Sequence, residues 1–144
     1  MRALILGGTR EARDLAKLLV DRGDDVISSL AGRVKNPALP VGEVRIGGFG
    51  GPEGLTAWIK EHSIDVLIDA THPFAEKISL SAATACKATG TPLIHLHRPA
   101  WTKQPGEQWI EVPTMDDAAR EAAKFSTVLL TIGRQKLASF APYD

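Results

Sequence analysis

The sequence predicts an α/β fold built on a doubly wound parallel sheet of about five strands, followed by the start of a second α/β domain. Three observations support this prediction. Short apolar runs alternate with segments of helical periodicity, a glycine turn joins the first run to the first helix, and the run at 65–70 is apolar on both faces. We expect a first domain over residues 1–101, with residues 102–144 forming a linker and the beginning of a truncated second domain.

The composition excludes several classes of protein. The 144 residues are 44% hydrophobic, enough for a buried core, and their formal net charge is zero. Because no large field of one sign exists, we expect neither a nucleic-acid binder nor a membrane-surface protein. The single cysteine, Cys86, rules out an intrachain disulfide and fits a reducing compartment. The N-terminus lacks a signal-peptide pattern and no apolar run approaches ~18 residues, so we expect a cytoplasmic protein.

The first predicted strand and helix enclose a glycine turn. Apolar residues 3–6 predict a buried strand, and apolar residues at helical spacing predict a helix over 11–20. Such a turn presents a nucleotide phosphate to the helix N-terminus, whose free N–H groups and dipole attract negative charge. Gly7 and Ala12 match the first and third positions of the G-x-G-x-x-G/A pattern, whereas Thr9 replaces the middle glycine.

This replacement leaves two interpretations of the turn. In the first, Thr9 donates its N–H and hydroxyl to a phosphate oxygen and Arg10 adds a positive charge. In the second, the turn needs small residues only for packing and binds nothing.

The second predicted strand, 25–31, closes a β-α-β unit after Gly23 ends the first helix. NAD-binding folds place an acid at the end of this strand, whereas NADP-binding folds prefer a cation there. Ser29 and Arg33 lie at this end, without an acid, which favours NADP if a dinucleotide binds. The alternative is that Arg33 is a solvated loop cation.

A second glycine-rich turn follows the short strand predicted at 43–46. Residues 47–51 contain four glycines around Phe49, at the carboxyl end of a strand, where open α/β sheets bind ligands. One interpretation is close backbone approach to a flat ligand with Phe49 stacked beside it. The other is a tight connection to the helix predicted at 55–62, with Phe49 in the core.

The central strand at 65–70 delivers Thr71 and His72 to the same edge of the sheet. A proline follows His72 and holds its backbone extended. The imidazole is suited to bind a substrate carboxylate or to move a proton, although capping or packing is the alternative role. No histidine is grouped with cysteines or carboxylates at metal-ligand spacing, so we expect no metal site.

The remaining pattern predicts a small-residue helix, a fifth strand and an incomplete second unit. The helix spans 75–89 and the strand 91–97, in which His95 is interpreted as structural while Arg98 lies near the ligand-binding end. Further strands are expected at 110–112 and 127–132. Between them, a helix is expected to turn four residues inward: Ala118, Ala119, Ala122 and Phe125.

Five spaced motifs carry a resemblance to a known family. They are Leu-Gly-Gly-Thr-x-Glu-Ala-Arg (6–13), Ser-Leu-Ala-Gly-Arg (29–33), Arg-Ile-Gly-Gly-Phe-Gly-Gly (45–51), Asp-Ala-Thr-His-Pro-Phe-Ala (69–75) and Arg-Pro-x-Trp (98–101). In this order they resemble the precorrin-6A reductase family of cobalamin biosynthesis, and Thr-Ile-Gly-Arg-Gln (131–135) resembles it too.

The resemblance implies an enzyme that transfers a hydride from NADPH to a tetrapyrrole, reducing precorrin-6A to precorrin-6B. It implies two Rossmann-like domains with the substrate between them, of which residues 1–101 would be the NADP-binding one. Members of the family are longer than this chain, so most of the second domain is missing and we leave the activity of residues 1–144 open.

The resemblance also assigns roles to individual residues. The phosphates and nearby ribose would be held by Gly7, Gly8, Thr9, Arg10 and Glu11. Ser29 and Arg33 would recognise the adenosine ribose and its 2′-phosphate. The nicotinamide and macrocycle would be bordered by Gly48, Phe49, Gly50, Thr71 and His72, with His72 as the candidate proton donor. Substrate carboxylates and the ring face would be contacted by Arg98, Trp101 and Arg134.

Two other functions compete with this one. The first is a different NADP-linked oxidoreductase that acts on a smaller substrate. The second is a nucleotide-sensing domain that binds without catalysis. Hydride transfer is compatible with the residues, because the cofactor carries the reaction and no activated nucleophile is needed.

Overall fold

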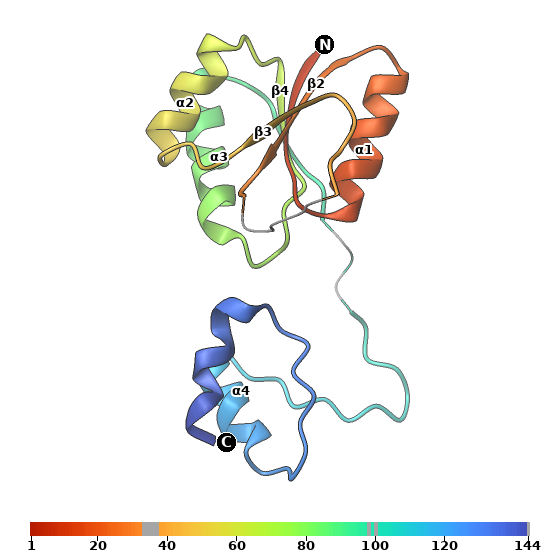
Figure 1. Ribbon diagram of the computed structural model, residues 1–144, viewed down its shortest axis with the longest axis vertical. Helices are drawn as coiled ribbons and strands as arrows, with labels where there is room; N and C mark the ends of the chain where they lie inside the picture. The colour runs from red at the N-terminus through yellow and green to blue at the C-terminus, as the bar shows by residue number, and fades with distance from the viewer. Residues whose placement is uncertain (33–37, 98, 100, 144) are drawn as a thin grey trace. The chain divides into compact units, whose positions relative to one another are not determined.

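The computed structural model describes residues 1–32, 38–97, 99 and 101–143 and divides the chain into two compact units, Met1–Pro99 and Ala100–Asp144 (Figure 1). We describe each unit by itself. That the first unit is an NADP-binding domain, and the second the beginning of an α/β domain, stays a prediction.

The first unit contains a five-stranded parallel sheet in the order β3-β2-β1-β4-β5. Its strands are β1 (Arg2–Leu6), β2 (Asp25–Leu30), β3 (Glu43–Ile46), β4 (Val66–Asp69) and β5 (Leu93–His95). The order reverses direction at β1, so the predicted doubly wound topology is confirmed. A switch point of this kind lies at the carboxyl edge, where such sheets bind ligands.

Helices cover both faces of this sheet (Figure 1). They are α1 (Arg10–Asp21), α2 (Pro52–Glu61) and α3 (Glu76–Thr89). Helix α1 packs its alanines Ala12 and Ala16 against one face, while α2 and α3 pack together over the other. Burial of both faces explains why β1 and β4 are apolar along nearly their whole length.

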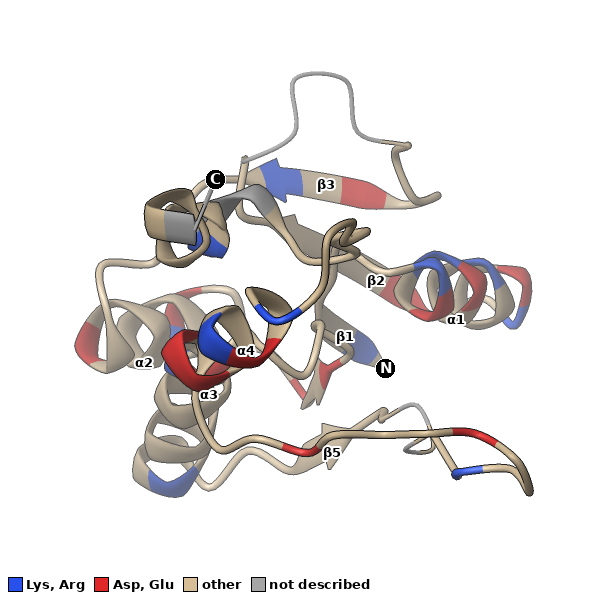
Figure 2. Ribbon diagram, turned by 90° about the horizontal axis from the view of Figure 1, so that it is seen from below, with Lys and Arg blue, Asp and Glu red and all other residues tan. Residues whose placement is uncertain are grey.

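The ends of α1 follow from its sequence. Thr9 is the N-cap, because its hydroxyl accepts a hydrogen bond from the N–H of Ala12 at 3.1 Å. Arg22 is the C-cap, and Gly23 then takes a φ of +90° that ends the helix, as predicted. Basic and acidic side chains alternate along the exposed face of α1 (Figure 2). Helix α2 begins three residues earlier than expected, because Gly51 is its N-cap and Pro52 suits its first turn.

The second unit contains α4 (Met115–Ala122) and two 3₁₀ segments, η1 (Arg134–Ser139) and η2 (Ala141–Tyr143). The strands predicted at 110–112 and 127–132 are wrong: neither segment forms a ladder. A strand needs a hydrogen-bonding neighbour, and these two segments do not pair with each other. Leu129 is 87% exposed, and Phe125, expected to face inward, is 59% exposed.

Candidate functional site

The carboxyl edge of the sheet gathers most residues that the sequence singled out. They lie at the carboxyl ends of four strands: Gly7, Gly8, Thr9, Arg10 and Glu11 after β1, Ser29 near the end of β2, Gly48, Phe49 and Gly50 after β3, and Thr71 and His72 after β4. Backbone hydrogen bonds join these strand ends, since Gly7 N–H donates to Ser29 O at 3.0 Å and Ala70 N–H donates to Leu6 O at 3.0 Å. The edge is therefore one continuous surface of the first unit.

The turn after β1 leaves open space in front of helix α1. Gly8 has a φ of +111°, a conformation that favours glycine, and no heavy atom lies within 4 Å of where its Cβ would be. The N–H groups of the first turn of α1 begin at this turn and have no acceptor within the helix. An anion placed here would meet both the helix dipole and these donors.

The Thr9 hydroxyl is already used within the protein. It accepts from Ala12 N–H and donates to the carbonyl of Ala70 at 2.8 Å, which joins α1 to the end of β4. A hydroxyl has one proton to donate, so in this geometry only the N–H of Thr9 is left for a phosphate. Arg10 does not fold back over the turn, because its Nε lies 3.6 Å from the Asp14 carboxylate along the exposed face of α1.

Ser29 has a partner that the sequence reasoning missed. The Ser29 side chain is buried, and its Oγ accepts a hydrogen bond of 2.8 Å from Nη1 of Arg45 in β3. The two residues are opposite each other in the parallel register. Arg45 also donates to the carbonyls of Gly47 and Gly48, at 2.9 and 3.1 Å. Register between β2 and β3 was the signal that could have paired them.

Phe49 takes the second of its two predicted roles, packing against the core. Its ring meets Trp58 edge-on at 5.6 Å and lies under the Arg45 guanidinium, 3.8 Å from the centroid. Trp58 in turn stacks on His62 at 3.9 Å. Gly54 makes this turn possible, because a Cβ there would lie 1.7 Å from the carbonyl oxygen of Phe49.

Asp69 is the second residue that the sequence reasoning missed. It ends β4 with 2% of its surface exposed, and its Oδ1 accepts from the N–H and hydroxyl of Thr71, at 3.1 and 2.7 Å. Burial raises the pKa of the Asp69 carboxyl, but Ser79, Thr71 and the charge of His95 lower it by more, so the net pKa lies below the ordinary value. The carboxylate therefore shapes the turn that carries Thr71.

Three imidazoles lie on this side of the sheet. His95, interpreted from the sequence as structural, places its Nδ1 3.5 Å from Oδ2 of Asp69 and stacks on His97 at 5.3 Å. Among the residues that the structure describes, Oδ2 of Asp69 has no hydrogen-bond partner. His72 is exposed, and its Nδ1 accepts from Phe74 N–H at 3.3 Å, so in this geometry its proton lies on Nε2.

Four predicted residues are not brought to this edge by what the structure describes. Arg33 and Arg98 lie outside the described residues, and so does the side chain of Arg134, whose backbone belongs to η1. Trp101 belongs to the second unit and is 88% exposed. Their roles stay predictions.

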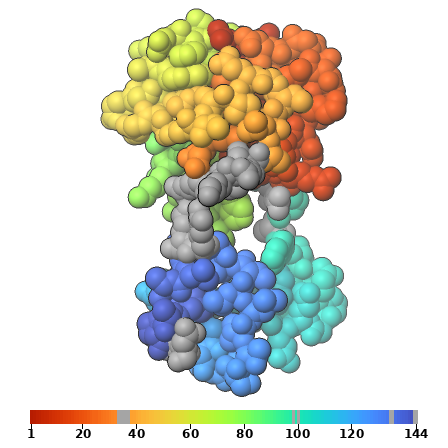
Figure 3. Space-filling view, viewed as in Figure 1, coloured from red at the N-terminus to blue at the C-terminus, as the bar shows by residue number. Residues whose placement is uncertain are grey.

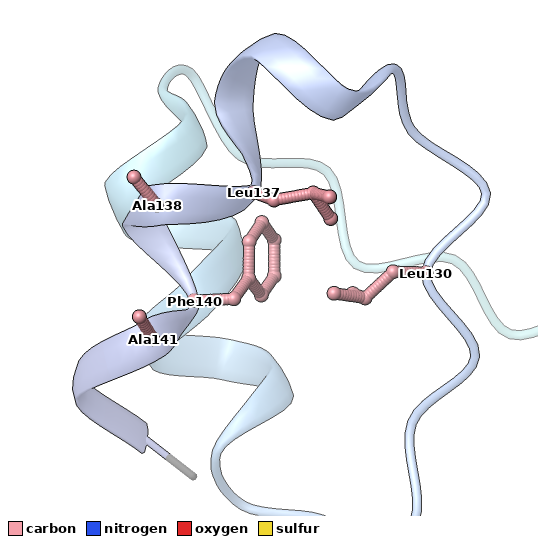
Figure 4. Close-up of a pocket in the computed structure, with 5 residues that line it drawn as sticks. All are labelled: Leu130, Leu137, Ala138, Phe140 and Ala141. Atoms are coloured by element: carbon pink, nitrogen blue, oxygen red, sulfur yellow. The ribbon is translucent and has the colours of Figure 1, made fainter.

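The second unit has hollows that are lined by its own residues. One is lined by Leu130, Leu137, Ala138, Phe140 and Ala141, and Figure 4 shows Leu130 pointing toward the Phe140 ring. Its lining holds no charged or titratable side chain, so it offers no chemistry of its own. In the described part of the chain, no three His, Cys, Asp or Glu side chains are grouped so that they could hold a metal ion. None of the helices described is long and apolar enough to cross a bilayer.

Comparisons with known proteins agree with this geometry. A family model described as precorrin-6x reductase CbiJ/CobK matches residues 2–144. Precorrin-6A reductase from Rhodococcus erythropolis is 51% identical over 97% of this chain and 57% of its own length. The enzyme of that name from Mycobacterium tuberculosis H37Rv is 51% identical over 99% of this chain and 58% of its own length.

A solved structure of CobK precorrin-6A reductase matches with a TM-score of 0.90 and 39% identity, covering 99% of this chain and 57% of that one. The chain thus spans less than three fifths of the length of these relatives. The family resemblance noted in the sequence motifs is confirmed by the family model and by both relatives. The chain belongs to the CbiJ/CobK family of precorrin-6x reductases.

Proposed function

We propose that the protein carrying this chain reduces the precorrin-6A macrocycle to precorrin-6B with a hydride taken from NADPH. The observation that carries the proposal is 51% identity to precorrin-6A reductases over nearly the whole chain. The carboxyl edge described above supports it, because it offers a helix N-terminus and open backbone where a dinucleotide would lie.

The residues present fit a nicotinamide dinucleotide. The N–H groups at the start of α1 would hold the pyrophosphate, and the open space at Gly8 leaves room for it. Gly7 would lie beside the pyrophosphate, with Arg10 and Glu11 beside the nearby ribose. Ser29 and Arg33 would contact the adenosine ribose and the 2′-phosphate. When bound, the nicotinamide supplies the hydride. The protein's part is to orient the two reactants and to keep water from the reacting atoms.

The other half of the edge would face the macrocycle. Gly48, Phe49, Gly50 and Thr71 would border it and the nicotinamide. His72 carries its proton on Nε2 in its present geometry, so it can donate a hydrogen bond that positions the substrate. To give the ring its proton, His72 would have to be protonated on both nitrogens, which would break the hydrogen bond from Phe74 N–H. The carboxylates of a tetrapyrrole would be bound by Arg98 and Arg134, with Trp101 against the ring face.

The test is to mix the complete protein with precorrin-6A and NADPH and to follow the loss of nicotinamide absorbance. We expect oxidation of NADPH in step with precorrin-6B formation. No oxidation with authentic substrate would rule the proposal out. Turnover only with a smaller substrate would favour the other oxidoreductase, and tight NADPH binding without turnover on any tetrapyrrole would favour a sensor.

A further inference from the structure

We propose that Arg45 recognises the 2′-phosphate of the dinucleotide and so sets the preference for NADPH over NADH. This inference rests on the proposed function, which supplies the dinucleotide. Neither the motif-based roles nor the comparisons assign Arg45 any function. Four features of the described residues support it: the position of Arg45, its free N–H donors, its uncompensated charge and its stacking.

The position of Arg45 is the first feature. In dinucleotide-binding sheets the adenosine ribose lies at the carboxyl end of the second strand. Arg45 is opposite Ser29 in the register of β2 and β3, next to that end. Residues 29–32 are Ser, Leu, Ala and Gly, so no acid in this segment competes with a phosphate for the guanidinium. Figure 2 shows the basic segment of β3 close to the tip of its arrow, and Figure 3 shows residues 40–60 on the surface of the first unit.

The hydrogen-bond count is the second feature. A guanidinium has five N–H donors, and Arg45 uses both of Nη1 and one of Nη2 for Ser29, Gly47 and Gly48. The Nε–H and the second N–H of Nη2 have no acceptor among the residues that the structure describes. A phosphate can be bound through two parallel hydrogen bonds by the Nε–H and one Nη N–H of an arginine, which are the groups that these two donors belong to.

The charge of Arg45 is the third feature. Among the residues that the structure describes, no carboxylate lies within 4 Å of this guanidinium, whereas Arg2, Arg10 and Arg22 each pair with an aspartate. Burial lowers the pKa of Arg45, but an arginine remains protonated at neutral pH. A half-buried cation without a counterion is an environment that an anionic ligand completes.

The stacking on Phe49 is the fourth feature. The guanidinium lies 3.8 Å from the Phe49 centroid and 5.7 Å from that of Trp58. Together with the bonds to two loop carbonyls, this holds the plane of the guanidinium before any ligand arrives. Preorganisation of this kind raises affinity because less side-chain freedom is lost on binding. A purely structural role, in which Arg45 only holds the 47–51 turn, would show the same contacts, so the experiment must separate the two.

The experiment measures binding of two adenosine nucleotides to the complete protein by calorimetry. Adenosine 2′,5′-bisphosphate carries the 2′-phosphate, and 5′-AMP lacks it. In Arg45→Met we expect affinity for the bisphosphate to fall about tenfold to a hundredfold, as for loss of a charged hydrogen-bonded pair, with 5′-AMP affected less than about twofold. Arg45→Lys keeps the charge but not the paired donors, so its affinity for the bisphosphate should lie between that of the unmutated protein and that of Arg45→Met. Arg22→Met is the matched control, because it removes an arginine at the amino end of the strands. It should change the affinity for neither nucleotide.

Each outcome is decisive. Equal losses for both nucleotides would mean that Arg45 only holds the turn, and would overturn the inference. The inference would also be overturned if Arg45→Met kept the full preference for the bisphosphate over 5′-AMP while Arg33→Ala lost it completely. If Arg45→Met does not fold, Arg45→Lys carries the comparison. An unmutated protein that binds both nucleotides equally would overturn the 2′-phosphate assignment, whereas one that binds neither would remove the dinucleotide site and with it the proposed function.

Discussion

The two sides of the carboxyl edge are built on opposite charges. On the β2–β3 side, Arg45 is a half-buried cation bonded to Ser29 and to the turn that follows β3. On the β4–β5 side, Asp69 is a buried anion bonded to the turn that follows β4, with His95 beside it. In both cases one charged side chain at a strand end holds the next turn in place.

The difference lies in what each charge has left to offer. Within the described part of the chain, Arg45 has two N–H donors without an acceptor and no counterion, which suits an anionic ligand. Asp69 is 2% exposed and its charge is directed at protein groups, so it acts through the turn that it shapes. A ligand would touch the first side chain directly and the second only through Thr71 and His72. Three substitutions test this contrast.

Gly54→Ala should have the largest effect, on the β2–β3 side. Alanine in a helix interior normally stabilises by about 0.5–1 kcal/mol, but here its Cβ would lie 1.7 Å from the Phe49 carbonyl oxygen. The turn carrying Phe49 must move, and we expect a net loss of about 3 kcal/mol, as in severe overpacking. Urea unfolding measures it. Glu53→Ala, on the exposed side of the same turn of helix, is the control; a more stable Gly54→Ala protein would show that the turn is not held tightly.

Asp69→Asn should have the next largest effect, on the β4–β5 side. The substitution removes the charge that the Thr71 N–H and hydroxyl bond to, so we expect a loss of about 2 kcal/mol at neutral pH. Nucleotide affinity should change less than in Arg45→Met. If nucleotide affinity changed equally in Asp69→Asn and Arg45→Met, the two sides of the edge would not differ in their contact with the ligand.

The pH dependence of this variant has a defined sign. Because the pKa of Asp69 is lowered in the folded protein, its contribution to stability is complete above the ordinary value of 3.8 and is lost as the pH falls through the folded value. The unmutated protein should therefore lose more stability between neutral pH and pH ~3 than Asp69→Asn does. Asp24 and Asp117 also have lowered pKa values, but they titrate in both proteins and cancel in the comparison.

Thr9→Ala should have the smallest of the three effects. It removes the N-cap of α1 and the hydrogen bond to Ala70 that joins α1 to the end of β4, for a loss of about 1.5 kcal/mol. Thr9→Ser keeps the hydroxyl and is the control. Thr114→Ala removes an N-cap without a long-range bond, so it should cost less. Equal costs for Thr9 and Thr114 would mean that the Ala70 bond adds nothing.

Much of the first unit could be predicted from the sequence, because local signals determine it. Helical spacing, Gly23 after α1 and the two-sided apolar run of β4 each define an element without reference to distant residues. The predicted strands at 110–112 and 127–132 are wrong because β-branched residues favour a strand but do not suffice for one: a strand also needs a neighbour to pair with.

The site divides in the same way. By itself the sequence determined the glycine turn, the strand-end positions of Ser29, Thr71 and His72, and the family to which its motifs belong, since each depends on residues near one another in the chain. Only the tertiary structure decided that Arg45 donates a hydrogen bond to Ser29, that the Thr9 hydroxyl donates to the carbonyl of Ala70, and that Gly54 must lack a side chain. These depend on strand register and on the approach of one backbone to another, which no local pattern encodes.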